Sequence, residues 1–102
     1  MNIVISNSFE TPLYKQIQNQ IKSQILSGEL DKDQMIPFIR SLSKELRVSI
    51  ITTKRAYEEL EKEGYIVTVP GKGSFVGTQS TERLKEAALY EMESKFLYSM
   101  YI

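Results

Sequence analysis

Five cationic side chains are gathered in residues 36–55, where Glu45 is the single acid. The segment therefore carries a net charge of +4, although the whole chain of 102 residues has 13 basic and 13 acidic side chains and is neutral. Lys and Arg side chains clustered in this way are suited to binding phosphate groups. The pattern predicts a local phosphate-binding surface. Because the protein has no net charge, long-range electrostatic attraction to a polyanion should be weak. The five cations are Arg40, Lys44, Arg47, Lys54 and Arg55.

Composition excludes most other chemistry. The chain contains neither Cys nor His, which removes disulfides, thiolate and imidazole metal ligands, thiol nucleophiles and histidine bases. The Glu residues alternate with Lys on predicted helical faces, which is typical of a solvated surface. Asp31 and Asp33 do not have the spacing of a calcium loop. We therefore expect no enzyme, no metal and no cofactor.

Two short helices and a sharp turn must position the cations. Apolar residues recur at helical spacing in residues 39–46, and the second helix is expected over residues 50–63. Residues 47–49 form the turn, with Ser49 as the N-cap of the second helix. This is a helix-turn-helix pattern, in which the start of the second helix enters the major groove. The inward face of that helix is predicted to be Thr53, Ala56, Tyr57 and Leu60.

A β-hairpin is predicted immediately after the second helix. Residues 65–69 and 74–76 are rich in β-branched and aromatic side chains, and residues 70–73 form the turn between them. Lys72 lies at the tip between Gly71 and Gly73, whose missing side chains permit a close backbone approach. Residues 35–37 are expected to be a short extended segment that pairs with the hairpin as a third strand.

A further helix is predicted before these elements. Thr11 is the expected N-cap, Pro12 the first helical residue and Gly28 the end. Residues 1–10 are expected to be an extended segment, with a short edge strand as one possibility. The apolar stripe of the helix is predicted to be Tyr14, Ile17, Ile21 and Ile25, whereas Lys15, Gln18, Gln20 and Lys22 are predicted to face water.

The predicted fold class is α+β, mainly α: a winged helix-turn-helix of three helices plus a β-hairpin wing in residues 1–77, followed by a C-terminal helical dimerisation segment in residues 78–102. The tail ends in an apolar and aromatic run that a monomer would leave exposed. We expect a second copy to cover it, and the alternative is that the tail folds back on its own domain. The predicted dimerisation residues are Leu84, Ala88, Leu89, Met92, Phe96 and Met100.

Bulk properties agree with a small globular domain. Apolar residues make up 41% of the chain and charged residues 25%, both ordinary values. No run approaches the roughly 20 apolar residues of a membrane span, and the N-terminus lacks a signal pattern. The expected location is the cytoplasm, with no membrane partner.

From Pro12 to Val76 the sequence resembles the DNA-binding domain of the GntR family of bacterial transcription regulators, and its short tail is similar to that of the YtrA subfamily. The matching segments are Pro12-Leu-Tyr-x-Gln-Ile, Ile25-Leu-Ser-Gly-Glu-Leu, Pro37-x-x-Arg-x-Leu, Glu45-Leu, Thr52-Thr, Glu59-Leu-Glu-x-Glu-Gly and Pro70-Gly-Lys-Gly-Ser-Phe-Val.

The resemblance implies a homodimer that binds a double-stranded DNA operator of two-fold symmetry. It favours repression, with operons for ABC transporters among the targets, and it names no effector. Arg40 matches a residue that contacts the DNA backbone and sometimes a base. Residues 71–73 match a wing tip that enters the minor groove. The positions of the second helix that match DNA-facing residues are Ser49, Ile50, Thr52 and Lys54. Together with Arg47 and Arg55 from the charge pattern, the predicted DNA-binding residues are Arg40, Arg47, Ser49, Ile50, Thr52, Lys54, Arg55, Gly71, Lys72 and Gly73.

Three residues depart from the family pattern. Phe38 stands where a capping Ser is usual, so the helix that follows is expected to start with a weaker cap. Arg47 replaces the customary turn Gly, at a cost of about 1 kcal/mol if the backbone there is left-handed. Ile50 replaces a frequent Arg, so a thymine methyl contact is the expected substitute for a guanine contact.

Duller interpretations stand beside these. The cations could be solvated surface charges, Lys72 an ordinary hairpin tip, and Ile50 and Ile51 either both core residues or one core and one groove-facing residue. A different function class is a winged helix used for protein contacts, whose apolar tail docks another partner. Zero net charge is its best support.

Overall fold

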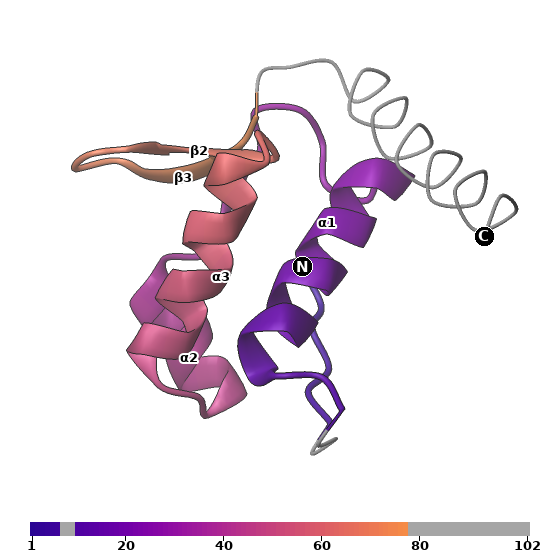
Figure 1. The fold of residues 1–102 in the computed structure, drawn as a ribbon. Coiled ribbons are helices and arrows are strands. Elements are labelled where there is room, and N and C mark those ends of the chain that lie inside the picture. The colour runs from indigo at the N-terminus through magenta and orange to yellow at the C-terminus, as the bar shows by residue number, and fades with distance from the viewer. Residues whose placement is uncertain (7–9, 78–102) are drawn as a thin grey trace, which may run out of the picture.

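The computed structural model describes residues 1–6 and 10–77, and within them it contains three helices and a three-stranded antiparallel sheet (Figure 1). The predicted winged helix-turn-helix is confirmed. The predicted tail helix and its dimerisation residues lie outside the described residues. None of the helices in this described part is both long and apolar enough to cross a bilayer. The elements are α1 (Leu13–Ser27), β1 (Met35–Ile36), α2 (Ile39–Leu46), α3 (Ile50–Lys62), β2 (Ile66–Val69) and β3 (Gly73–Val76).

Helix α1 begins one residue later than predicted. Pro12, and not Thr11, is the N-cap, and no side chain caps the helix there. The predicted end is confirmed, because Gly28 adopts a left-handed conformation with φ of 85° and donates its N–H to the Ile25 carbonyl. The isoleucines of the predicted stripe are buried in the core. They are Ile17, Ile21 and Ile25.

Gln18 does not face water, and that prediction is wrong. Its side chain is 2% exposed, because the end of α3 lies over it and its amide nitrogen is 3.5 Å from the Glu63 carboxylate. Lys22, one turn further along α1, forms an ion pair of 3.3 Å with Glu63. Partial burial lowers the pKa of Lys22, but the opposing effects of Tyr65 and Glu63 outweigh it and leave that pKa raised. The polar face of α1 is therefore partly an interhelical surface.

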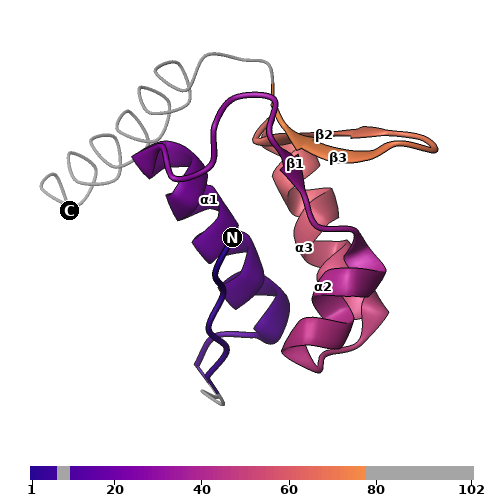
Figure 2. The same ribbon diagram turned by 180° about the vertical axis from the view of Figure 1, so that it is seen from behind.

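Helix α3 is the central helix of the domain and packs against both α1 and α2 (Figures 1 and 2). Its predicted inward face is confirmed, since Thr53, Ala56, Tyr57 and Leu60 are all buried. The predicted cap is confirmed as well, because Ser49 Oγ accepts the Thr52 N–H at 3.1 Å. A buried hydrogen bond of 2.8 Å from Ser43 Oγ to Thr53 Oγ1 joins α2 to α3.

Tyr57 ties α3 to the segment that leads into α2. Its ring is 1% exposed, and its hydroxyl donates a hydrogen bond of 2.6 Å to the Pro37 carbonyl. Burial raises the pKa of the Tyr57 phenol, so the group stays protonated and remains a donor. The contact sets where α2 begins relative to α3.

The sheet has the strand order β1-β3-β2, which confirms the predicted third strand. The turn of the hairpin has three residues and not the predicted four, because Gly73 already pairs with Val69. Lys72 N–H donates to the Val69 carbonyl at 3.0 Å, and Gly71 has the positive φ of 78° that the third position of a type II turn requires. The hairpin projects from the end of α3 to the side away from α1 (Figures 1 and 2).

The first six residues form an extended arm along α1 (Figures 1 and 2) and not an edge strand of the sheet. Three glutamines four residues apart on α1 bind the backbone of every second residue of the arm. Four helical residues rise about 6.0 Å and two extended residues about 6.6 Å, so the two repeats match. The pairs are Gln16 with Ser6, Gln20 with Val4, and Gln24 with Asn2.

We expect Gln20→Ala to release the arm and to lower the free energy of unfolding by about 1 kcal/mol, since it removes two exposed hydrogen bonds to Val4. Urea unfolding and hydrogen exchange of the Val4 amide measure the effect. The exposed neighbour Asn19→Ala is the control and should change neither. Unprotected exchange at Val4 in the unaltered protein would contradict the prediction.

Candidate nucleic-acid interface

The outward face of α3 lies opposite its buried stripe and carries Ile51, Lys54, Arg55 and Glu58. Ile51 is 80% exposed and its neighbour Ile50 is 49% exposed. Both earlier alternatives for these isoleucines are therefore wrong, because neither side chain is in the core. Val48 of the turn packs against the core at this point instead. The helix thus begins with two adjacent apolar side chains in solvent.

Two of the predicted DNA-binding cations are held by neighbours. Lys54 Nζ lies 4.0 Å from a Glu58 carboxylate oxygen, one helical turn away. The Arg55 guanidinium lies 3.9 Å from the centroid of the Tyr14 ring on α1, within range of a cation–π interaction. Both charged groups at the start of the outward face therefore have a partner within the domain.

Three exposed cations of α2 and the turn are not held in this way. Arg40, Lys44 and Arg47 form no ion pair within residues 1–6 and 10–77. Lys44 contributed to the predicted charge but was not among the predicted DNA-binding residues. It becomes a candidate for DNA contact because it is exposed and has no acidic partner among the described residues. Lone cations are the better phosphate ligands, because they need not leave an acid first.

Arg47 has a left-handed backbone, with φ of 57° and ψ of 43°, so the condition for the expected cost of a non-glycine residue at the turn is met. Its N–H caps the end of α2 by donating to the Lys44 carbonyl at 3.3 Å. A side chain at such a position is strained, whereas glycine is not. The chain therefore keeps a cation at the corner at some cost in stability.

We expect Arg47→Gly to raise the free energy of unfolding by about 0.5 to 1 kcal/mol, because the left-handed strain is relieved and the greater freedom of unfolded glycine offsets part of the gain. Arg47→Ala removes the same charge and keeps the strain, so it should give no such gain. Urea unfolding of the two variants side by side is the measurement. Equal stabilities would show that the strain is absent.

Ser49 and Thr52 are engaged in capping α3. Their hydroxyl oxygens are 2.7 Å apart, in addition to the capping bond from the Thr52 N–H. The two hydroxyls stabilise the first turn of α3, next to Ile50. Their contact with DNA remains a prediction.

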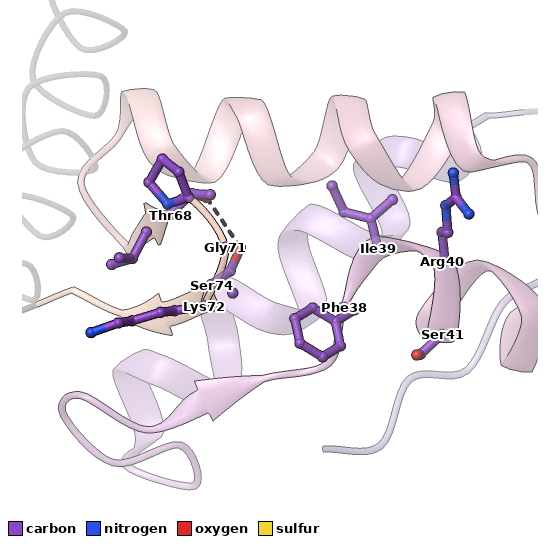
Figure 3. Close-up of a pocket in the computed structure, with 11 residues that line it drawn as sticks. Phe38, Ile39, Arg40, Ser41, Thr68, Gly71, Lys72 and Ser74 are labelled. Carbon is purple, nitrogen blue, oxygen red and sulfur yellow. Dashed lines mark hydrogen bonds between the residues drawn. The ribbon is translucent and has the colours of Figure 1, made fainter.

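The wing tip and the first turn of α2 enclose an open groove of about 610 Å³. Arg40 and Lys72 both line it, and Figure 3 shows Phe38 between the two elements, with Lys72 directed away from Phe38. Phe38 is 53% exposed and makes no capping hydrogen bond, which confirms the expected weaker cap. Gly73 has φ of 131°, and a Cβ there would lie 2.9 Å from Met35 Cε and 3.0 Å from Phe38 Cε1.

The wing is braced against α3 by hydrogen-bonded side chains. The Glu61 carboxylate accepts a hydrogen bond from the Thr68 hydroxyl, and Thr68 Oγ1 lies 3.1 Å from Ser74 Oγ on the facing strand (Figure 3). This brace connects the far half of α3 to both strands of the hairpin. Sequence inspection did not identify it, since Glu61 had the pattern of a solvated acid.

Across residues 1–6 and 10–77, no three acidic side chains gather in a way that could hold a metal ion. The described functional features are those of contact with a polyanion: an exposed start of α3, cations on α2 and the turn that form no ion pair among the described residues, and a cationic wing tip. Together with the fold they define a winged-helix DNA-binding domain.

Residues 13–76 match the family of bacterial regulatory proteins called the gntR family. The chain is 32% identical over 87 residues to the transcriptional repressor YtrA of Bacillus subtilis, covering 85% of this chain and 67% of that protein. The chain therefore belongs to the GntR family, whose members are DNA-binding transcriptional regulators. These relatives are regulators and not enzymes, in keeping with the prediction.

Solved structures support the same assignment. YtrA of Sulfolobus acidocaldarius is similar with a TM-score of 0.75 and 32% identity, covering 91% of this chain and 83% of that one. The DNA-binding domain of AraR in complex with operator ORR3 is similar with a TM-score of 0.64 and 31% identity, covering 76% and 93%. Against longer relatives of the family, the chain spans as little as 14% of the relative's length.

Proposed function

We propose that this protein is a transcriptional repressor that binds a two-fold DNA operator as a homodimer. The observation that carries the proposal is the exposed first turn of α3, preceded by α2 and a turn whose exposed cations Arg40, Lys44 and Arg47 form no ion pair within the described residues. Each monomer inserts the start of α3 into the major groove and brings Lys72 of the wing to the neighbouring minor groove. Phosphate contacts supply most of the affinity, and side chains of α3 supply the sequence preference.

Relatives support the DNA partner and the direction of regulation. YtrA of Bacillus subtilis is a repressor by name, and the similar AraR domain was crystallised with operator DNA. The homodimer rests on the apolar residues of segment 78–102, which a monomer would expose. Resemblance to the YtrA subfamily extends the proposal to operons for ABC transporters as targets. We propose no effector, and we place the protein in the cytoplasm.

Selection of duplexes from a random DNA library by the immobilised full chain tests this function. The expected result is a two-fold symmetric consensus whose half-sites are about one helical turn apart. Sedimentation of the free protein and of its complex gives the number of subunits. Recovery of no sequence above background, or a strictly monomeric complex on an asymmetric site, would overturn the proposal. Footprinting the promoter of the protein's own gene then tests self-regulation.

A further inference from the structure

Ile51 is the most exposed large apolar side chain in the part of the chain that the structure describes, at 80%. A single exposed isoleucine needs no explanation. Here, however, Ile51 follows another exposed isoleucine, Ile50, in the first turn of the helix that the proposed function places in the major groove. The two form an apolar surface at the point of α3 that approaches base edges first.

The charged neighbours of Ile51 leave it uncovered. It lines a shallow hollow of about 380 Å³ together with Lys54, Arg55, Glu58 and Glu59. Lys54 is turned toward Glu58, and Arg55 is stacked on Tyr14 of α1. Long basic side chains often cover adjacent apolar surface with their aliphatic stems, but Lys54 and Arg55 are directed toward Glu58 and Tyr14 instead. Ile51 is therefore presented to whatever docks on this face.

The bases differ in what they offer to an apolar side chain. In the major groove the thymine 5-methyl group is the one apolar feature, and the other edges present hydrogen-bond donors and acceptors. A branched apolar side chain pressed against those edges would remove water from them without replacing their hydrogen bonds, which is unfavourable. The chemistry of Ile51 thus favours thymine and disfavours the other bases at its position.

We propose that Ile51 is a specificity-determining residue that recognises a thymine methyl group in each operator half-site, with Ile50 packing beside it. This inference rests on the proposed function, since it needs the start of α3 in the major groove. It assigns Ile51, which lies outside the predicted contact set, and gives it the leading role in methyl recognition that sequence inspection assigned to Ile50.

Deoxyuridine substitution tests the inference, because uracil differs from thymine only by that methyl group. In a duplex selected by the full chain, each thymine of the half-site is replaced in turn by uracil, and binding is measured by fluorescence anisotropy. One position should weaken binding by about fourfold, the equivalent of one buried methylene-sized group. The same replacement should have no effect on the variant Ile51→Ala, whereas Ile51→Val should keep most of it.

Val4→Ala is the matched control, because Val4 is also an exposed β-branched residue, at 69%, but lies on the arm beside α1. It should keep the full sensitivity to uracil. The inference is overturned if no half-site thymine is sensitive, if Ile51→Ala keeps the sensitivity, or if Ile50→Ala alone abolishes it. Each of these results requires a duplex that the protein has selected, so they are distinct from failure of the proposed function, in which no duplex is selected.

Discussion

Raising the salt concentration from about 50 to about 200 mM is expected to weaken DNA binding roughly 10²-fold for each subunit that contacts the duplex. On α2, the turn that follows it and the wing tip, each subunit offers four exposed cations that form no ion pair among the described residues, namely Arg40, Lys44, Arg47 and Lys72. Each phosphate contact adds about 0.9 to the slope of log affinity against log salt. The expected slope is therefore about 3.6 for one subunit and about 7 for a dimer on a two-fold site.

Charge variants show which cations produce that slope. Arg40→Gln, Arg47→Gln and Lys72→Gln should each lower it by about 1 per subunit. Lys62→Gln is the matched control, because Lys62 lies at the far end of α3 and is paired with Glu59 at 3.5 Å. It should leave the slope unchanged. Binding that is indifferent to salt, or a loss with Lys62→Gln equal to the others, would assign the interface to the wrong edge of the domain.

Truncating Tyr57 is expected to have the largest effect on stability, with Tyr57→Ala lowering the free energy of unfolding by about 4 kcal/mol. The ring is almost fully buried where α3 meets the core, and its hydroxyl bonds the Pro37 carbonyl. Truncation leaves a cavity of aromatic size and an unpaired carbonyl. Because small domains have total stabilities of about 5 to 15 kcal/mol, much of the margin would be lost.

A second variant separates the two contributions of Tyr57. Tyr57→Phe keeps the ring and loses the hydrogen bond, at an expected cost of about 1 kcal/mol, and it stays measurable if Tyr57→Ala does not fold. Ile51→Ala on the exposed side of the same helix should change stability by less than about 0.5 kcal/mol. Urea unfolding followed by circular dichroism measures all three. Similar losses for Tyr57→Phe and Tyr57→Ala would show that the cavity contributes nothing.

Much of the fold could be predicted because the decisive interactions are local. The spacing of apolar residues placed the three helices, Ser49 was identifiable as a cap from its position before Ile50, and Gly28 as a helix end. The smaller errors have local causes too. Helix α1 starts one residue later than predicted, after Pro12, and Gly73 belongs to β3 and not to the turn of the wing. Helix and strand ends depend on which backbone groups find hydrogen-bond partners.

The candidate site was only partly predictable. Sequence showed where cations are concentrated, but not that Glu58 and Tyr14 contact two of them while Arg40, Lys44 and Arg47 form no ion pair in the described part of the chain. Nor did it show that Ile50 and Ile51 are both in solvent, because a helical period with two adjacent isoleucines fits a buried position as well as an exposed one. Val48 is the apolar residue of the turn that packs against the core.

The sequence by itself determined the elements, the capped turn between α2 and α3, and the place of the cationic segment, because these depend on residues a few positions apart. Tertiary structure alone decided that Gln20 holds Val4, 16 residues away, and that Glu63 lies over Gln18, 45 residues away. A glutamine has the same helical pattern whether water or a distant backbone is its partner. Its role is settled only when helices pack and bring that partner within hydrogen-bond distance.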